Sequence, residues 1–145
     1  MVGSSMEIEK VPRVRDQSLC PCKSRKVYGE CCRRYHLGLA VPERAEELMR
    51  ARYSAYFFRL KEYLVETTHP DVRTPELREE IRETLNHALW GFLTILGTSK
   101  GEAGDRTGKV EFIAEYYHHE VRHEHHEVSR FRRYKGVWKY VDDRG

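Results

Sequence analysis

CPCKSRKVYGECC, residues 20–32, contains all four cysteines of this 145-residue chain. A structural zinc ion takes four ligands in a tetrahedron, with thiolate sulfur about 2.3 Å from the metal. Cys20, Cys22, Cys31 and Cys32 therefore predict one zinc site that holds the N-terminal segment together. Thiolates in such a closed site are poor nucleophiles, so the pattern does not favour a catalytic cysteine.

Disulfide bonds are the alternative use of the four thiols, and they persist in oxidising compartments. Residues 1–10 contain two glutamates and no apolar run, so they do not resemble a secretory signal. We therefore expect a cytoplasmic protein with reduced thiols. A bond between the neighbours Cys31 and Cys32 would be strained, but a crossed pairing of Cys20 with Cys31 and of Cys22 with Cys32 stays open.

The cysteine segment resembles the SEC-C motif, the zinc module at the C-terminal tail of the translocase ATPase SecA. The matching positions are the two cysteine pairs with Pro21, Ser24, Lys26 and Tyr28. Two glycines of the usual pattern are replaced here, by Lys23 and Arg25. Glycine adopts positive φ angles without strain, so these replacements bear on the turn between the two ligand pairs.

Further segments extend the resemblance along nearly the whole chain. They are PERAEELMRARYSAY (42–56), THPDVR (68–73), GKVEFIAEYY (108–117), HEVSRF (126–131) and VWKYVD (137–142). In this order they are similar to the YchJ-like family of bacterial proteins, which join a SEC-C motif to a domain like nuclear transport factor 2 (NTF2). The resemblance implies a curved sheet that wraps a long helix and leaves a cone-shaped pocket. It implies no assigned biochemical function.

Hydrophobic periodicity independently predicts an α+β fold. Apolar residues spaced three and four apart indicate one helix from Pro42 to about Glu66. A second helix is expected to begin with Thr74 as N-cap and Pro75 in its first turn. The period then changes to two, which predicts four strands over residues 90–98, 107–119, 120–134 and 137–142. Helices followed by an antiparallel meander are typical of α+β domains.

These patterns predict three parts in the chain. Residues 1–15 are expected to be a flexible N-terminus, 16–37 a SEC-C zinc-binding motif, and 42–145 an NTF2-like α+β domain. The short zinc segment has few aliphatic residues, so we expect an appendage whose folding depends on the metal while the domain folds without it.

Pocket residues are predicted only from matched segments and strand alternation. The candidates are Tyr53, His69, His126, Glu127 and Arg130, and Arg52 also lies in a matched segment. Alternate residues of a strand face opposite sides, so His126 and Glu127 cannot both enter one pocket directly.

The alternative is an Arg–Glu network on the open face of the sheet, together with core histidines that have hydrogen-bond partners. Arg130 is predicted to bind a carboxylate bidentately, with Glu111 and Glu115 as candidate partners.

Histidines also gather near the third expected strand. His118, His119, His123, His125 and His126 raise the possibility of a second metal site, because imidazole is a common metal ligand. Their spacing fixes no third ligand, so a solvated, titratable face of the sheet is the preferred interpretation.

Positive charge is concentrated around the cysteines. Residues 10–34 carry eight Lys or Arg against two acidic residues, a balance of +6 in a chain whose net charge is +3. Part of this charge compensates the thiolates of the metal site. The rest predicts contact with an acidic protein surface through Lys23, Arg25, Lys26, Arg33 and Arg34.

Other partners are less favoured by the sequence. The basic region lacks the aromatic pattern of RNA-binding motifs, so nucleic acid is a minority hypothesis. No apolar run approaches the ~20 residues that span a bilayer, and both a monomer and a homodimer stay open.

Two functions are compatible with the sequence. The favoured one is a non-enzymatic binding module, in which the zinc knuckle contacts a macromolecule and the α+β domain is a scaffold or small-ligand pocket. The alternative is a small-molecule hydrolase or isomerase that uses the cone pocket, with His69, Glu127 or Arg130 contributing.

Overall fold

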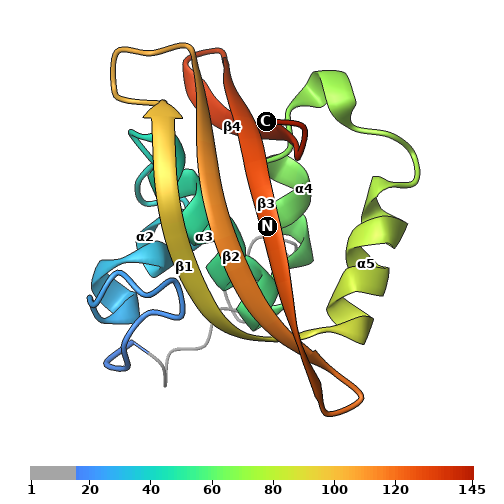
Figure 1. The fold of residues 1–145 in the computed structure, drawn as a ribbon. Helices are drawn as coiled ribbons and strands as arrows, with labels where there is room; N and C mark the ends of the chain where they lie inside the picture. Colours follow the sequence, from blue (N-terminus) through green and yellow to red (C-terminus); the bar gives the residue numbers. More distant parts are fainter. Residues whose placement is uncertain (1–15) are drawn as a thin grey trace, which may run out of the picture.

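The structure is a computed structural model that describes residues 16–145 (Figure 1). The expected flexible N-terminus, residues 1–15, lies outside the described residues. The α+β fold is confirmed, with the cysteine segment first, the helices next and the sheet last. The elements are η2 (Tyr28–Glu30), α2 (Cys32–His36), α3 (Ala45–Phe58), α4 (Lys61–Glu66), η3 (Pro70–Val72), α5 (Leu77–His87), β1 (Leu89–Lys100), β2 (Thr107–His118), β3 (Val121–Tyr134) and β4 (Val137–Asp142).

The four strands form one antiparallel meander in the order β1-β2-β3-β4. Two-residue turns join β2 to β3 at His119 and Glu120 (φ 52° and 66°) and β3 to β4 at Lys135 and Gly136 (φ 50° and 82°). Positive φ at both central residues is the geometry whose twist matches that of the flanking strands. The sheet curves around α3, which lies behind it in Figure 1.

Strand β1 contains two irregularities that sequence periodicity does not reveal. Its register with β2 shifts between Trp90 and Phe92 and again between Ile95 and Gly97. Such bulges bend a strand and change which side chains share a face. The first shift places Trp90 and Leu93, three residues apart, against the same buried cluster, so Trp90 faces the interior of the curved sheet.

The single helix expected over residues 42–66 is wrong, because it is divided into α3 and α4. Arg59 ends α3 in a left-handed conformation (φ 63°), and the amide of Leu60 donates to the carbonyl of Ala55 at 2.8 Å. The Arg59 guanidinium also donates to the carbonyl of Leu85, at the end of α5. This tertiary contact supports a helix end at a residue that usually avoids positive φ.

The start of α5 is also later than expected. Its N-cap is Glu76 rather than Thr74, because the carbonyl of Thr74 accepts from the amide of Leu77 in a preceding turn. Pro75 lies in that turn and not in the first turn of the helix.

Helix α3 lies between two buried clusters. One face packs with the sheet in a cluster that includes Leu48, Met49, Phe112, Phe131 and Trp138. The other face packs with the cysteine segment and helices α4 and α5, and the buried members of this second cluster are Cys20, Cys22, Tyr28, Cys31, Cys32, Tyr35, Ala51, Ala55, Leu60, Leu64, Val65, Ile81 and Leu85. The expected appendage is therefore part of a shared core. The boundaries 16–37 and 42–145 stay a prediction.

A close backbone approach anchors the β1–β2 loop to the start of α3. The carbonyl of Gly101 accepts from the amide of Ala45 at 2.9 Å. The amide of Gly101 donates to the carbonyl of Thr107 at 3.1 Å. A Cβ atom on Gly108 would lie 2.4 Å from the Cα of Gly101, closer than real Cβ contacts allow. Only glycine fits at position 108 without moving this backbone.

We predict that Gly108→Ala lowers the free energy of unfolding by roughly 1–3 kcal/mol, because the added methyl group must push the loop away from α3. Gly104→Ala is the matched control, since a Cβ there meets nothing within 4 Å. Urea unfolding followed by circular dichroism measures both variants. Equal midpoints for the two proteins would show that the loop yields without cost.

Candidate functional site

The four cysteine sulfurs converge on one point. All four Sγ atoms lie within 4.8 Å of one another, with 3.7 Å between those of Cys22 and Cys31 and 4.0 Å between those of Cys31 and Cys32. A tetrahedral ion with metal–sulfur distances of about 2.3 Å would place its sulfurs roughly 3.8 Å apart. The four cysteines are buried and free of disulfide bonds, so this cluster can hold a metal ion.

A tight loop presents the first cysteine pair. Leu19 and Val27 form an antiparallel bridge, and the amide of Cys20 donates to the carbonyl of Lys26 at 2.8 Å. Within the loop Lys23 and Arg25 adopt φ angles of 65° and 75°. The two residues that replace glycines thus take the conformation that glycine favours, at a cost of about 1–2 kcal/mol each.

Side chains from the loop and from α3 contact the sulfurs. The hydroxyl of Ser24 lies 3.1 Å from the Sγ of Cys31, and that of Ser54, in α3, lies 3.4 Å from the Sγ of Cys20. Such contacts around a metal site orient its ligands and stabilise thiolate charge. Ser54 is fully buried, so the cysteine cluster is held from the side of the α+β domain as well as from its own loop.

A buried hydrogen-bond chain makes a second link to α3. The hydroxyl of Tyr28 lies 2.6 Å from Nδ1 of His36, whose Nε2 lies 2.8 Å from the carbonyl oxygen of Ala51. A carbonyl only accepts, so Nε2 carries the proton and Nδ1 accepts from Tyr28. Burial lowers the pKa of His36 to about 4, which keeps the imidazole neutral in this arrangement.

The five basic residues near the cluster divide into two groups. Arg33 pairs with Asp16 at 3.0 Å, and Arg34 donates to the carbonyl of Cys31 and to the hydroxyl of Tyr35. Both are partly buried, which corrects their expected place in an outward-facing basic surface. Lys23, Arg25 and Lys26 are exposed and form no ion pair with another described residue.

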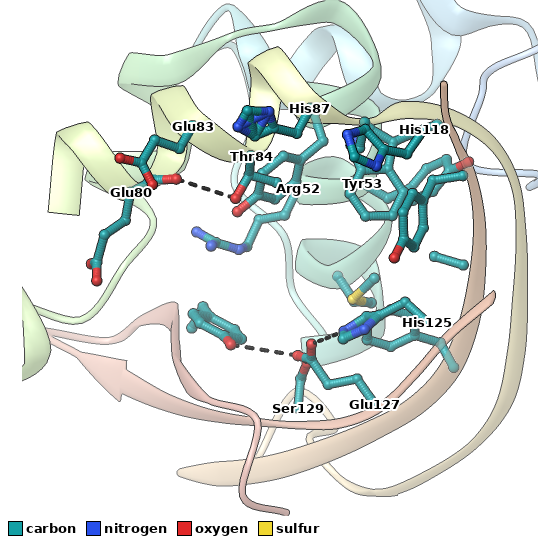
Figure 2. A pocket seen from close by; sticks show the side chains of 18 residues that line it. Arg52, Tyr53, Glu80, Glu83, Thr84, His87, His118, His125, Glu127 and Ser129 are labelled. Atoms are coloured by element: carbon teal, nitrogen blue, oxygen red, sulfur yellow. Dashed lines mark hydrogen bonds and ion pairs between the residues drawn. The ribbon is translucent and has the colours of Figure 1, made fainter. Parts of the chain in front are cut away.

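A pocket of about 660 Å³ opens between α3, α5 and the concave face of the sheet (Figure 2). Aromatic side chains make up much of its wall, together with several ionisable groups. The aromatic, ionisable and hydroxyl-bearing residues of the wall include Arg52, Tyr53, Tyr56, Glu80, Glu83, Thr84, Trp90, Tyr116, Glu127 and Tyr140. A cavity of this size and mixed polarity matches those that hold small organic ligands.

Glu127 is the most strongly bound carboxylate in this pocket. It accepts from Ser129 Oγ and, at 3.4 Å, from the hydroxyl of Tyr140, and it lies 2.7 Å from Nε2 of His125. Burial alone would raise the pKa of Glu127, but the hydrogen bonds from His125 and Ser129 outweigh it and the pKa is lowered. The carboxylate is therefore a stable anion with most of its acceptor capacity in use.

Arg52 enters the pocket from α3, on the same apolar stripe as Met49 and Tyr53. Sequence reasoning placed it in a matched segment but did not propose it for the pocket. The signal that would have found it is a charged residue among apolar neighbours three and four positions away. Its guanidinium packs over the ring of Tyr140, 4.4 Å from the centroid.

Of the five expected pocket residues, the structure places Tyr53 and Glu127 in the wall. The prediction that His69 lines the pocket is wrong. His69 is buried outside the pocket wall, beside Arg132, and its Nδ1 accepts from the amide of Asp71. The same prediction is wrong for His126 and Arg130, because both lie on the face of β3 that points away from the pocket.

On that face the ion pairs differ in part from those expected. His126 lies 2.6 Å from Glu111. Arg130 binds a carboxylate bidentately, as expected, but the partner is Asp142 and not Glu111 or Glu115. Glu115 pairs with Arg122 instead.

The histidines near the β2–β3 turn lie close together, but their ring nitrogens do not converge on one point. The ring of His118 lies 4.1 Å from that of His119, 5.8 Å from that of His87 and 6.5 Å from that of His123, centroid to centroid. Within residues 16–145, the cysteines are the only group of three or more potential ligands whose donor atoms converge within 4.8 Å. A second, preformed metal site is therefore absent from this part of the chain.

No helix in the described part of the chain has both the length and the apolar character needed to cross a membrane.

Sequence comparison identifies the same architecture. Residues 44–143 match the family described as the YchJ middle NTF2-like domain. A UPF0225 protein of Geobacter sulfurreducens is 41% identical over 128 residues, which cover 88% of this chain and 80% of the relative. A UPF0225 protein of Yersinia pestis is 40% identical over 126 residues, 86% of this chain and 81% of the relative.

Two solved structures share the fold. The solution structure of a SEC-C motif containing protein from Rhodopseudomonas palustris has a TM-score of 0.75 at 32% identity, covering 85% of this chain and 94% of that one. The crystal structure of a SEC-C motif containing protein from Psychrobacter arcticus has a TM-score of 0.74 at 27% identity, covering 90% and 84%. Both the motif resemblance and the NTF2-like fold expected from the sequence are confirmed.

Proposed function

This chain belongs to the YchJ-like family with an NTF2-like middle domain, and from that premise we propose that it is a zinc-containing, non-enzymatic protein that binds a small organic molecule. The observation that carries the proposal is the 660 Å³ pocket, in which aromatic walls surround a few fixed polar groups. Pockets of this kind bury most of a small ligand and use the polar groups for orientation.

Zinc is the metal that the cysteine cluster suits best. Tetrahedral four-sulfur sites are typical of zinc or iron, and zinc is the usual ion of small structural modules. Four protein ligands leave no open position for substrate, so the ion has a structural role. Thiolates stay reduced in the cytoplasm, which is the location we propose.

Binding is favoured over catalysis by the state of the pocket carboxylate. A general base works best with a pKa near the operating pH, whereas the hydrogen bonds to Glu127 lower its pKa against the opposing effect of burial. His125 is already hydrogen-bonded to that carboxylate, and this bond raises the pKa of the imidazole. The pair is suited to holding a fixed charge. A hydrolase or isomerase activity is the alternative that turnover assays would reveal.

A macromolecular partner at the cysteine loop is a second proposal, supported by backbone strain. Lys23 and Arg25 hold positive φ angles that glycine would adopt freely, so these exposed basic side chains are kept at an energetic cost. They border a groove that includes Leu19 and Phe57, both exposed apolar residues. An acidic protein surface with apolar side chains fits this combination.

The zinc proposal predicts one zinc ion per chain by elemental analysis and loss of zinc in Cys20→Ser. Because the cysteines share a core with α3, α4 and α5, chelation is expected to increase hydrogen exchange at Ala51, Ala55 and Leu64 as well as within residues 16–37. Faster exchange confined to residues 16–37 would show that the cysteine segment is an independent appendage after all.

The pocket proposal predicts that a ligand found by metabolite screening loses affinity by at least about tenfold in Thr84→Trp. Thr84 is exposed on α5 and lines the pocket, so the indole would occupy the ligand volume without disturbing the core. Arg82→Trp, on the same helix but outside the pocket wall, is the matched control. Equal loss in both variants would contradict a ligand site in this pocket. Steady turnover of the ligand by the wild type would contradict a non-enzymatic role.

The partner proposal predicts that the double variant Lys23→Gly, Arg25→Gly folds at least as stably as the wild type but retains less acidic protein from bacterial extract. Glycine adopts positive φ without strain, which should raise the free energy of unfolding. The greater freedom of glycine in the unfolded chain offsets part of this gain. Retention by the wild type should also fall as salt increases. The double variant Arg106→Gly, Lys109→Gly removes two other exposed basic side chains and is the control for net charge. Unchanged retention by the double variant would restrict the loop to a structural role.

A further inference from the structure

Arg52 is a buried cation without a carboxylate partner in the described part of the chain. The residue is only 6% exposed. Within residues 16–145 its Nη1 atom makes all three hydrogen bonds of the guanidinium, to the carbonyl of Leu64 at 2.9 Å, Thr67 Oγ1 at 2.7 Å and Thr68 Oγ1 at 3.4 Å. The Nε and Nη2 atoms have no hydrogen-bond partner among residues 16–145. Burying a charge is costly unless the charge is paired.

The unpaired edge of this guanidinium belongs to the pocket. Figure 2 shows Arg52 extending from α3 into the space between α5 and the sheet. The ring of Tyr140 supports one face of the guanidinium, and the bonds to Nη1 fix its orientation. The Nε–Nη2 edge of an arginine is a planar pair of donors that matches the two oxygens of a carboxylate.

Other donors in the same wall also lack partners. The Tyr53 hydroxyl and Trp90 Nε1 are buried and have no hydrogen-bond partner among the described residues. Both side chains line the pocket. Arg52, Tyr53 and Trp90 therefore each present a donor that has no acceptor among the described residues.

Resting on the proposed small-ligand function, we infer that the pocket recognises a monocarboxylate with an aromatic or apolar body. The carboxylate binds the Nε–Nη2 edge of Arg52, and the body packs against the rings of Tyr56, Trp90 and Tyr116. The carboxylate supplies the missing counter-charge to Arg52, while the aromatic wall supplies contact area.

The carboxylates that line the pocket favour a ligand with a single negative charge over one with two. Glu80, Glu83 and Glu127 also line it, whereas Arg52 donates only to Leu64, Thr67 and Thr68 among the described residues. A dianion such as a phosphate monoester would be repelled by these carboxylates more strongly than a monoanion. The ligand class is thus a carboxylate and not a phosphate ester.

The test compares three probes of similar shape: 3-phenylpropionate, 3-phenylpropionamide and 2-phenylethyl phosphate. Each is titrated into the full-length, zinc-loaded protein and followed by NMR shifts of the pocket residues. We expect 3-phenylpropionate to bind at least about tenfold more tightly than either other probe. Equal affinity for the carboxylate and the amide overturns the inference but leaves a small-ligand pocket intact. Tighter binding of the phosphate also overturns it. Binding of none of the probes overturns the inference, while the metabolite screen still decides the proposed function.

Variants assign the preference to Arg52. Arg52→Lys retains the charge but loses the planar pair of donors, so the preference for carboxylate over amide should fall at least about fivefold. Arg130→Lys is the matched control, because Arg130 binds Asp142 on the opposite face of the sheet. Arg52 also holds the end of α4, so thermal unfolding is measured for each variant. If Arg52→Lys does not fold, the three probes on the wild type decide the inference. An unchanged preference in folded Arg52→Lys overturns the role of the arginine.

Discussion

The contact between the cysteine cluster and helix α3 is the interaction on which the rest of the structure depends. Ser54 and the carbonyl of Ala51 bind the cysteine segment on one side of the helix, while Met49 and Tyr53 pack against the sheet on the other. A helix held from both sides has a fixed rotation about its axis. The direction in which Arg52 enters the pocket is therefore set partly by the cysteine cluster, although the two sites share no residue.

The buried polar groups of this protein differ in whether they have hydrogen-bond partners. Around the cysteines they form closed sets, as in the chain from Tyr28 through His36 to Ala51. In the pocket the sets are closed at Glu127, which accepts from several donors, but open at Arg52. Since polar groups are buried at little cost only when they are paired, the contrast separates a fully paired structural interior from a cavity whose guanidinium is the group that the proposed carboxylate ligand would pair.

Sequence patterns predicted the chemistry that is local in the chain. The cysteine cluster, the antiparallel meander and the placement of His126 and Glu127 on opposite faces of β3 all follow from spacings of a few residues. The division of the long helix at Arg59 could not be predicted, because no glycine or proline marks it and the contact with Leu85 that supports it is tertiary. The bulges of β1 and the pocket role of Arg52 likewise depend on elements far apart in the sequence. His69 and His126 were misplaced because membership of a motif does not specify the direction of a side chain.

The cysteine loop shows how backbone conformation can be retained when its usual residue is replaced. Lys23 and Arg25 adopt the φ angles expected of glycine because the paired ends of the loop and the convergent sulfurs leave it little freedom. A metal ion would strengthen that constraint, since its ligand geometry supplies far more free energy than two strained residues cost. The loop can therefore carry basic side chains at positions where an unconstrained turn would need glycine. The cysteines therefore determine the shape of the loop even where two of its turn positions carry side chains other than glycine.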